Sequence, residues 1–150
     1  MPFTGSYVCT TLTTKLWDAQ INRTDTFRLA LYDSTATLTD ATTAYTATGE
    51  LATAGGYTAG GATTACTIST ASTANGTVVI VDFADVSWAA ATFTCRGALL
   101  YDDTAAGDPA MFILDFGTNK SPVAATFTVT FPSATANAGM AVFQAVLTNP

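Results

Sequence analysis

The sequence predicts a mainly β fold, an antiparallel β-sandwich of which the jelly roll is one form, with a short helix near the N-terminus. Residues 126–131 give the clearest reason, because Phe127, Val129 and Phe131 alternate with threonines as in a strand with one buried face. Similar runs recur along the chain, and Asn75-Gly76 is a typical signal for a hairpin turn. About seven or eight such strands separated by turns favour a sandwich.

The expected strands follow the apolar runs in chain order, at 27–32, near Cys66 and Ile68, and at 78–83, 93–101, 111–116, 126–131 and 141–147. Residues 27–32 are expected to bury one face, formed by the odd-numbered side chains. Residues 78–83 are apolar on both faces, which places that strand in the middle of a sheet. Within 93–101 the odd-numbered residues, Cys95 among them, are expected to face the core. Residues 117–119 (Gly-Thr-Asn) are interpreted as a turn.

A short helix is expected close to the N-terminus. Val8, Leu12 and Leu16 recur at the spacing that places side chains on one face of a helix. Ser6 precedes this run and is the expected N-cap. The threonines between these residues are weak helix formers, so we expect the helix to be short.

The whole chain, residues 1–150, is expected to form a single domain with a long excursion at about 33–73 that is rich in Thr, Ala and Gly. Tyr45 and Tyr57 lie within the excursion, and their large apolar rings indicate that it docks on another part of the molecule. The glycine pairs Gly55-Gly56 and Gly60-Gly61 are interpreted as tight turns or close approaches of the backbone, because no phosphate-binding motif follows them.

Composition restricts the partners of the chain. Charged residues make up only 11% of the sequence, which leaves the surface poorly protected against association and predicts a homo-oligomer, a dimer or a trimer. The net charge is −6 and the five basic residues are scattered, so direct binding to nucleic acid or to an anionic membrane is not expected. The N-terminus does not resemble a secretion signal, and synthesis in a cytoplasm is expected.

No enzymatic chemistry is predicted. The chain has no histidine, so catalytic triads, cysteine–histidine pairs and histidine metal sites are excluded. Glu50 is the single glutamate, and the aspartates are better explained as turn residues than as paired acids. Asp102, Asp103 and Asp108 share one loop, but their spacing matches no calcium-binding loop, so neither a metal nor a cofactor is expected. The three cysteines are expected to be free thiols, with Cys95 in the core.

Three residues are the candidates for an interface. Tyr45 and Tyr57 lie in the excursion, and Arg96 lies among threonines on a strand, where it would form a salt bridge with a partner or remain solvated. Together with Trp17 and Trp88 the two tyrosines would also suit sugar stacking, although packing in the core is the commoner role of such rings.

Several segments in a fixed order resemble a family of small virion proteins of tailed bacteriophages. These segments cover most of residues 7–132, namely Asp25-Thr26-Phe27-Arg28-Leu29-Ala30-Leu31-Tyr32, Thr43-Ala44-Tyr45, Gly56-Tyr57-Thr58-Ala59-Gly60-Gly61, Asp82-Phe83-Ala84-Asp85-Val86-Ser87-Trp88, Arg96-Gly97-Ala98-Leu99-Leu100-Tyr101, Leu114-Asp115-Phe116-Gly117 and Phe127-Thr128-Val129-Thr130-Phe131-Pro132. The chain departs from the family pattern in its Thr-rich N-terminal region and after Pro132.

The resemblance implies a structural, non-enzymatic protein of the virion. The expected function is that of a capsid cement or decoration protein, which binds the major capsid protein on the outer surface of the assembled head and stabilises it. The expected contact segments are residues 33–73 and the C-terminal stretch. The alternative is a tail or host-adhesion component that binds a surface glycan.

Overall fold

The structure is a computed structural model that describes residues 3–73, 76–132 and 141–144. It is mainly β and antiparallel, as the sequence predicted, with one short helix among the described residues. The elements are β1 (Tyr7–Val8), α1 (Thr10–Trp17), β2 (Phe27–Tyr32), β3 (Ala62–Thr64), β4 (Cys66–Thr73), β5 (Gly76–Phe83), β6 (Val86–Ala91), β7 (Cys95–Asp102), β8 (Ala110–Lys120), β9 (Ala125–Val129) and β10 (Ala141–Gln144).

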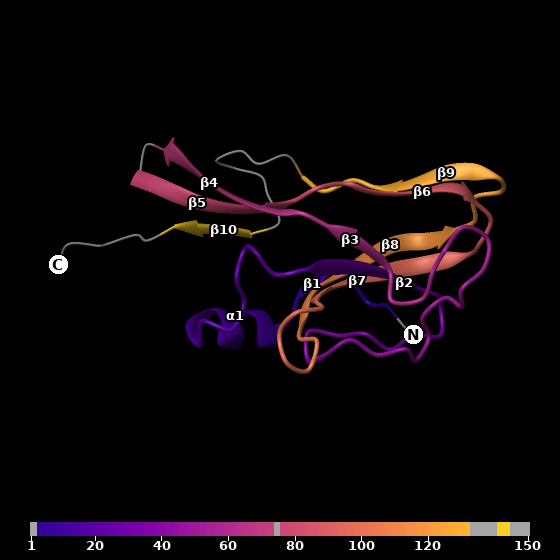
Figure 1. The fold of residues 1–150 in the computed structure, drawn as a ribbon, viewed down its shortest axis with the longest axis horizontal. Coiled ribbons are helices and arrows are strands. Elements are labelled where there is room, and N and C mark those ends of the chain that lie inside the picture. Colours follow the sequence, from indigo (N-terminus) through magenta and orange to yellow (C-terminus); the bar gives the residue numbers. More distant parts are fainter. Residues whose placement is uncertain (1–2, 74–75, 133–140, 145–150) are drawn as a thin grey trace.

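The strands form two facing layers (Figure 1). One layer is a five-stranded sheet in the order β1-β8-β7-β2-β3. The opposite layer contains a three-stranded sheet, β10-β5-β4, and a two-stranded sheet, β6-β9. The β4–β5 hairpin extends away from the β6–β9 end of the molecule, so that part of the upper layer projects as an arm, which we define as β4, β5 and β10.

The main core lies between the two layers. Phe27, Leu29 and Leu100 of the five-stranded sheet face Phe83 and Trp88 of the opposite layer, and all five side chains are buried. The rings of Phe27 and Phe83 pack edge to face with centroids 5.3 Å apart. Burying one such side chain contributes about 1.5–3 kcal/mol, so this cluster is the main source of stability.

The outer face of the five-stranded sheet is buried as well. A second apolar cluster there joins Tyr32, Leu99 and Ile113 of the sheet to Leu38 of the excursion and to Phe3. The prediction that Phe27, Leu29 and Leu31 face one side of β2 is confirmed, and the opposite side is buried too. The odd-numbered residues do face the main core, but the excursion covers Ala30 and Tyr32 on the other side.

An irregular pairing between β7 and β8 changes which side chains face the main core. Cys95 pairs with Lys120 and Gly97 with Asp115, so residues 116–119 of β8 stand opposite Arg96 alone. Cys95 is buried in the main core, as predicted, whereas Leu99 and Tyr101 point to the outer cluster. The predicted alternation over 93–101 thus fails after Cys95, at the point where the register between β7 and β8 shifts. Residues 117–119 are not a turn but part of this bulged strand.

The N-terminal helix is confirmed, with a different beginning. Val8 belongs to β1 and is 52% exposed, and the helix begins only at Thr10. Ser6 does not cap it, because its hydroxyl accepts the N–H of Asp115 at 2.9 Å and so attaches the N-terminal segment to β8. Leu12 is buried as expected.

The upper layer bears out most of the remaining predictions. The alternation of buried and exposed residues at 126–131 is confirmed. β5 is the central strand of its sheet, as predicted, and it forms a hairpin with β4. The turn at residues 74–75 and the end of the predicted 141–147 strand lie outside the described residues. β6 was not predicted, because its sequence, VSWAAA, has little apolar alternation.

The glycine pairs of the excursion make close approaches to other backbone segments, as predicted. Gly61 has φ +79°, and a Cβ atom at this position would lie 2.2 Å from the carbonyl oxygen of Leu29. Only glycine combines this conformation with such a short approach. Gly107 has a similar φ, +83°, but has open space around it.

These two glycines allow a matched test. We expect Gly107→Ala to lower the free energy of unfolding by about 1 kcal/mol, since it adds only backbone strain. Gly61→Ala adds a clash with backbone, and we expect a loss of about 3 kcal/mol or more. Urea denaturation of both variants measures the difference, and equal losses would contradict the close packing of the excursion on β2.

Candidate interaction surface

The carboxylate of Glu50, the single glutamate of the chain, attaches the excursion to the sheet. One carboxylate oxygen, Oε1, accepts the hydroxyl of Tyr57 at 2.5 Å and the N–H of Gly60 at 2.6 Å. The other, Oε2, accepts the hydroxyl of Tyr45 at 2.5 Å. Hydrogen bonds to an ionised oxygen are short and about twice as strong as neutral ones. The carboxylate therefore joins three points of an otherwise irregular segment.

The same tyrosines connect this segment to the strands. The hydroxyl of Tyr57 accepts the N–H of Leu31 on β2 at 3.0 Å, and the ring of Tyr45 stacks on Tyr101 of β7 with centroids 4.6 Å apart. Tyr101 in turn donates to the carbonyl of Gly60 at 2.8 Å. We call Tyr45, Glu50, Tyr57, Gly60 and Tyr101 the Glu50 cluster.

The tyrosines of this cluster remain protonated donors at physiological pH. Burial, followed by the charge of Asp103, raises the pKa of Tyr101 to about 12. Burial and the hydrogen bond to Glu50 raise the pKa of Tyr45 and that of Tyr57 still further. A proton loss that would break the cluster is thus excluded near neutral pH.

The structure places the three candidate interface residues within contacts of the chain itself. Tyr57 is 2% exposed and belongs to the main core, and Tyr45 is half-buried by its stacking on Tyr101. Arg96 pairs within the chain, since its Nη2 lies 3.1 Å from Asp115 Oδ1 and both side chains are largely buried, while its buried Nη1 has no hydrogen-bond partner among the described residues. Tyr45 and Tyr57 meet at Glu50, whereas Arg96 pairs with Asp115, so the three residues do not form a common patch. No local pattern in the sequence identifies these partners.

The aromatic side chains offer little support for a sugar-binding platform. Trp88 is buried beside Tyr57 and Phe127 in the main core. The side chain of Trp17 lies outside the description.

Two of the acidic residues singled out in the sequence contact other parts of the chain, whereas the buried Oδ2 of Asp102 has no hydrogen-bond partner among the described residues. Asp103 pairs with Arg28 at 2.8 Å, and Asp108 accepts the N–H of Tyr45 through its backbone carbonyl. Within residues 3–73, 76–132 and 141–144, no group of three or more carboxylates and thiols is arranged to hold a metal ion.

The cysteines are free thiols with little nucleophilic character. Burial raises the pKa of Cys9 to about 11 and that of Cys95 to about 12. Burial also raises the pKa of the half-buried Cys66. Because the thiolate is the reactive form, none of the three environments favours catalysis.

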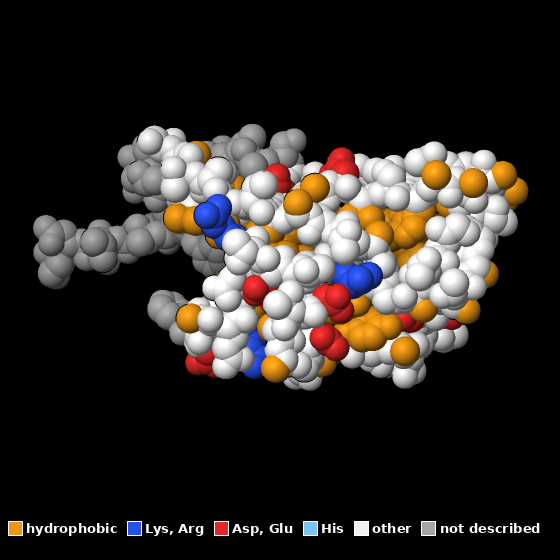
Figure 2. All heavy atoms as spheres, in the orientation of Figure 1, with side chains coloured by type: hydrophobic (Ala, Val, Ile, Leu, Met, Phe, Trp, Pro, Cys, Tyr) orange, Lys and Arg blue, Asp and Glu red, His pale blue; other side chains and the backbone are white. Residues whose placement is uncertain are grey.

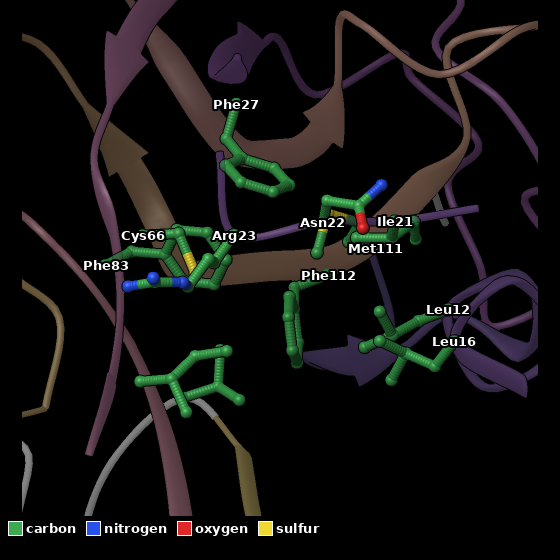
Figure 3. A pocket seen from close by; sticks show the side chains of 12 residues that line it. Leu12, Leu16, Ile21, Asn22, Arg23, Phe27, Cys66, Phe83, Met111 and Phe112 are labelled. Carbon is green, nitrogen blue, oxygen red and sulfur yellow. The ribbon is translucent and has the colours of Figure 1, made fainter. Parts of the chain in front are cut away.

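An apolar hollow lies between α1 and the arm (Figure 3). Leu12 and Leu16 approach it from the helix, and Phe27, Phe83 and Phe112 from the strands. Its cavity volume of about 60 Å³ is far below the roughly 300–1,000 Å³ of a small-molecule site. The hollow is therefore better suited to contact with a protein surface than to a ligand.

A wider, open depression of about 310 Å³ lies between β8 and β9. Its charged groups are Asp115, which is paired with Arg96, and Lys120, whose Nζ donates to Thr118 Oγ1. The polar groups are thus satisfied within the chain, and no set of groups converges there for catalysis.

Apolar side chains are exposed around the hollow, and charges are sparse. Ile68 is 49% exposed, while Leu16 and Val79 are each 38% exposed. Ile68 and Val79 lie on the arm and Leu16 lies on α1. Figure 2 shows patches of apolar side chains on one face of the molecule, with a group of acidic and basic side chains near its middle. The candidate site is hence a weakly charged interaction surface, formed by the outside of the excursion, where Asp40 is exposed, and by the arm.

The chain matches no known family model, no curated protein and no solved structure. Within the described residues, no helix has the length and apolar character needed to cross a membrane.

Removing the carboxylate should release the excursion. We expect Glu50→Ala to lower the free energy of unfolding by about 3 kcal/mol, because two tyrosine hydroxyls and one backbone N–H lose their acceptor. Asp18→Ala removes an exposed carboxylate and should change stability by less than about 0.5 kcal/mol. Chemical denaturation of both variants tests this, and similar losses would contradict the role of Glu50.

Asp102 gives the fold a measurable pH dependence. The residue is fully buried, and its Oδ1 accepts the N–H groups of Thr104 and Ala105 at 2.8 and 3.1 Å. Burial raises the pKa of Asp102, with a further contribution from the neighbouring Asp25. The folded state therefore favours the protonated acid, and its stability falls as pH rises through the raised pKa.

Asp102→Asn should remove this dependence. Asparagine is neutral and still offers an oxygen to the two N–H groups, so we expect the variant to be more stable than wild type at pH 7. The advantage should shrink near the ordinary aspartate pKa of about 3.9, where Asp102 itself takes up a proton. Thermal unfolding at both pH values is the measurement, and a variant less stable at pH 7 would refute the argument.

Proposed function

We propose that this chain is a structural virion protein of a tailed bacteriophage, a cement or decoration protein that binds the outside of the assembled head. The family resemblance of residues 7–132 supports the viral role. The physical support is one observation: the excursion presents a threonine-rich surface with few charges that is already fixed in place by the Glu50 cluster. A surface that needs no ordering loses little conformational entropy on binding.

The chemistry of this surface suits a permanent interface. Along the excursion Ala36 and Leu38 are buried, while Thr37 and Thr39 point outward. Threonine side chains offer methyl groups and hydroxyls without the desolvation cost of a charge. The partner is the major capsid protein, and binding only to the assembled shell stabilises that shell by mass action.

The net charge of −6 favours the outer surface of the head, away from packaged DNA. The chain would be made in the bacterial cytoplasm and would join the particle there. The alternative, a tail or host-adhesion protein that binds glycan, has less support, since Trp88 and Tyr57 are buried.

Imaging of intact particles of the encoding phage tests the proposal. We expect a regular lattice of copies over the outer shell, which would also identify the face in contact with the capsid. A few copies restricted to the tail would refute it in favour of the adhesion role, and absence from the particle would refute both.

The contact face can be tested separately with exposed threonines. Thr37→Lys changes the outside of the excursion, and Thr126→Lys changes β9 on the opposite layer. We expect the first to weaken binding to purified heads about tenfold or more and the second to leave it unchanged. Deleting the excursion would be less informative, because it covers the outer apolar cluster and its loss would unfold the sheet.

A further inference from the structure

The outer edge of the arm is formed by β4. This strand has eight residues and is the last in the order β10-β5-β4, and in the described part of the chain no strand pairs with its outer side. In Figure 1 it projects with β5 beyond the body of the molecule. Its backbone donors and acceptors are consequently available to another strand.

The pairing with β5 identifies the residues that offer these groups. Ala84 donates to the carbonyl of Ala65 at 2.9 Å, immediately before Cys66 pairs with Phe83. The register continues without a shift to Thr73 and Gly76. Because antiparallel pairs alternate between bonded and non-bonded positions, the even-numbered residues 66, 68, 70 and 72 direct their N–H and C=O groups to the free edge.

This edge lacks the features that usually prevent strand pairing. β4 reads CTISTAST and contains no charge, no proline and no bulge. Other edges in the described part are short or irregular: β1 has two residues, β3 has three, and β6 pairs with a register shift. β4 is thus a long, uncharged and regular edge strand, whereas the other edge strands just named are short or irregular. Such an edge indicates a partner strand.

We propose that β4 pairs with β4 of a second copy of this chain, antiparallel about a two-fold axis, and so joins two three-stranded sheets into one of six strands. Such a closed, isologous contact is the commonest symmetry of homo-oligomers. The even-numbered residues of the two copies face each other when the axis passes at Ser69. Ile68 then lies opposite the partner's Thr70.

A second copy suits this edge better than a foreign strand. Identical strands that carry charge would place like charges close together, and β4 carries none. Pairing also covers Ile68, which is 49% exposed beside the apolar hollow. The inference does not depend on the proposed viral function.

The test uses the intact chain and one position, Thr70. Thr70→Pro removes an N–H that points to the free edge, where proline is compatible with a strand. Thr70→Val keeps this N–H and the β-branched shape. In sedimentation velocity over a concentration series, we expect dimers for wild type and Thr70→Val. For Thr70→Pro we expect a dissociation constant weaker by about 30-fold or more, since two symmetry-related hydrogen bonds are lost.

Circular dichroism and the thermal midpoint establish whether Thr70→Pro is folded. If it is not, Ile68→Lys is the second variant, since it places like charges near each other across the axis. Val123→Lys changes an exposed apolar residue away from the arm, and its dimer should be unchanged.

The proposal is overturned by a monomeric wild type, or by a folded Thr70→Pro or Ile68→Lys that dimerises like wild type. A monomeric wild type whose binding to heads is abolished by Thr70→Pro would instead assign the edge to a capsid strand.

Discussion

One carboxylate holds together residues 33–61, the part of the excursion that forms neither helix nor strand. Glu50 accepts hydrogen bonds from Tyr45, Tyr57 and Gly60, and the two tyrosines reach β7 and β2 respectively. An irregular segment rich in Thr, Ala and Gly loses much entropy when it is ordered, and it has few large side chains to compensate. The half-buried carboxylate of Glu50 accepts hydrogen bonds from several donors, so it attaches this segment strongly to the sheet.

The fixed excursion determines the rest of the architecture. Because it covers the outer face of the five-stranded sheet, β2 and β7 are buried on both faces and can be almost wholly apolar. The opposite layer covers the inner face, and its β4–β5 hairpin extends beyond the core as an arm. The resulting surface has few charges, is preorganised and is poorly protected at one sheet edge, which suits a protein that acts by assembly. The same burial removes tyrosines and thiols from chemistry by raising their pKa values.

The fold class could be predicted from the sequence because several strands have one buried face and one face exposed to water, which produces a visible alternation. The alternation around Phe127 is visible because the threonines of that strand are exposed. The prediction failed in β7, because the side chains that face the main core change from odd to even numbers where the register with β8 shifts, and because both faces are buried. The role of Glu50 follows no periodicity, because its partners lie in an irregular segment. A lone glutamate between two tyrosines in a nearly uncharged segment was the available clue. The partners of Arg96 and Tyr57 depend on contacts between distant segments, which no local pattern specifies.

Hydrogen–deuterium exchange of the intact chain tests most directly whether the excursion is a fixed surface. Peptides covering residues 33–61 would be compared between wild type and Glu50→Gln, in which the amide replaces one acceptor oxygen with a donor. If Glu50 fixes the excursion, exchange is slow in wild type, approaching that of β2 and β7, and residues 33–61 exchange faster in the variant while β6 and β9 are unchanged. Exchange of residues 33–61 in wild type at the rate of an unstructured peptide, or no difference between the two chains, would contradict it.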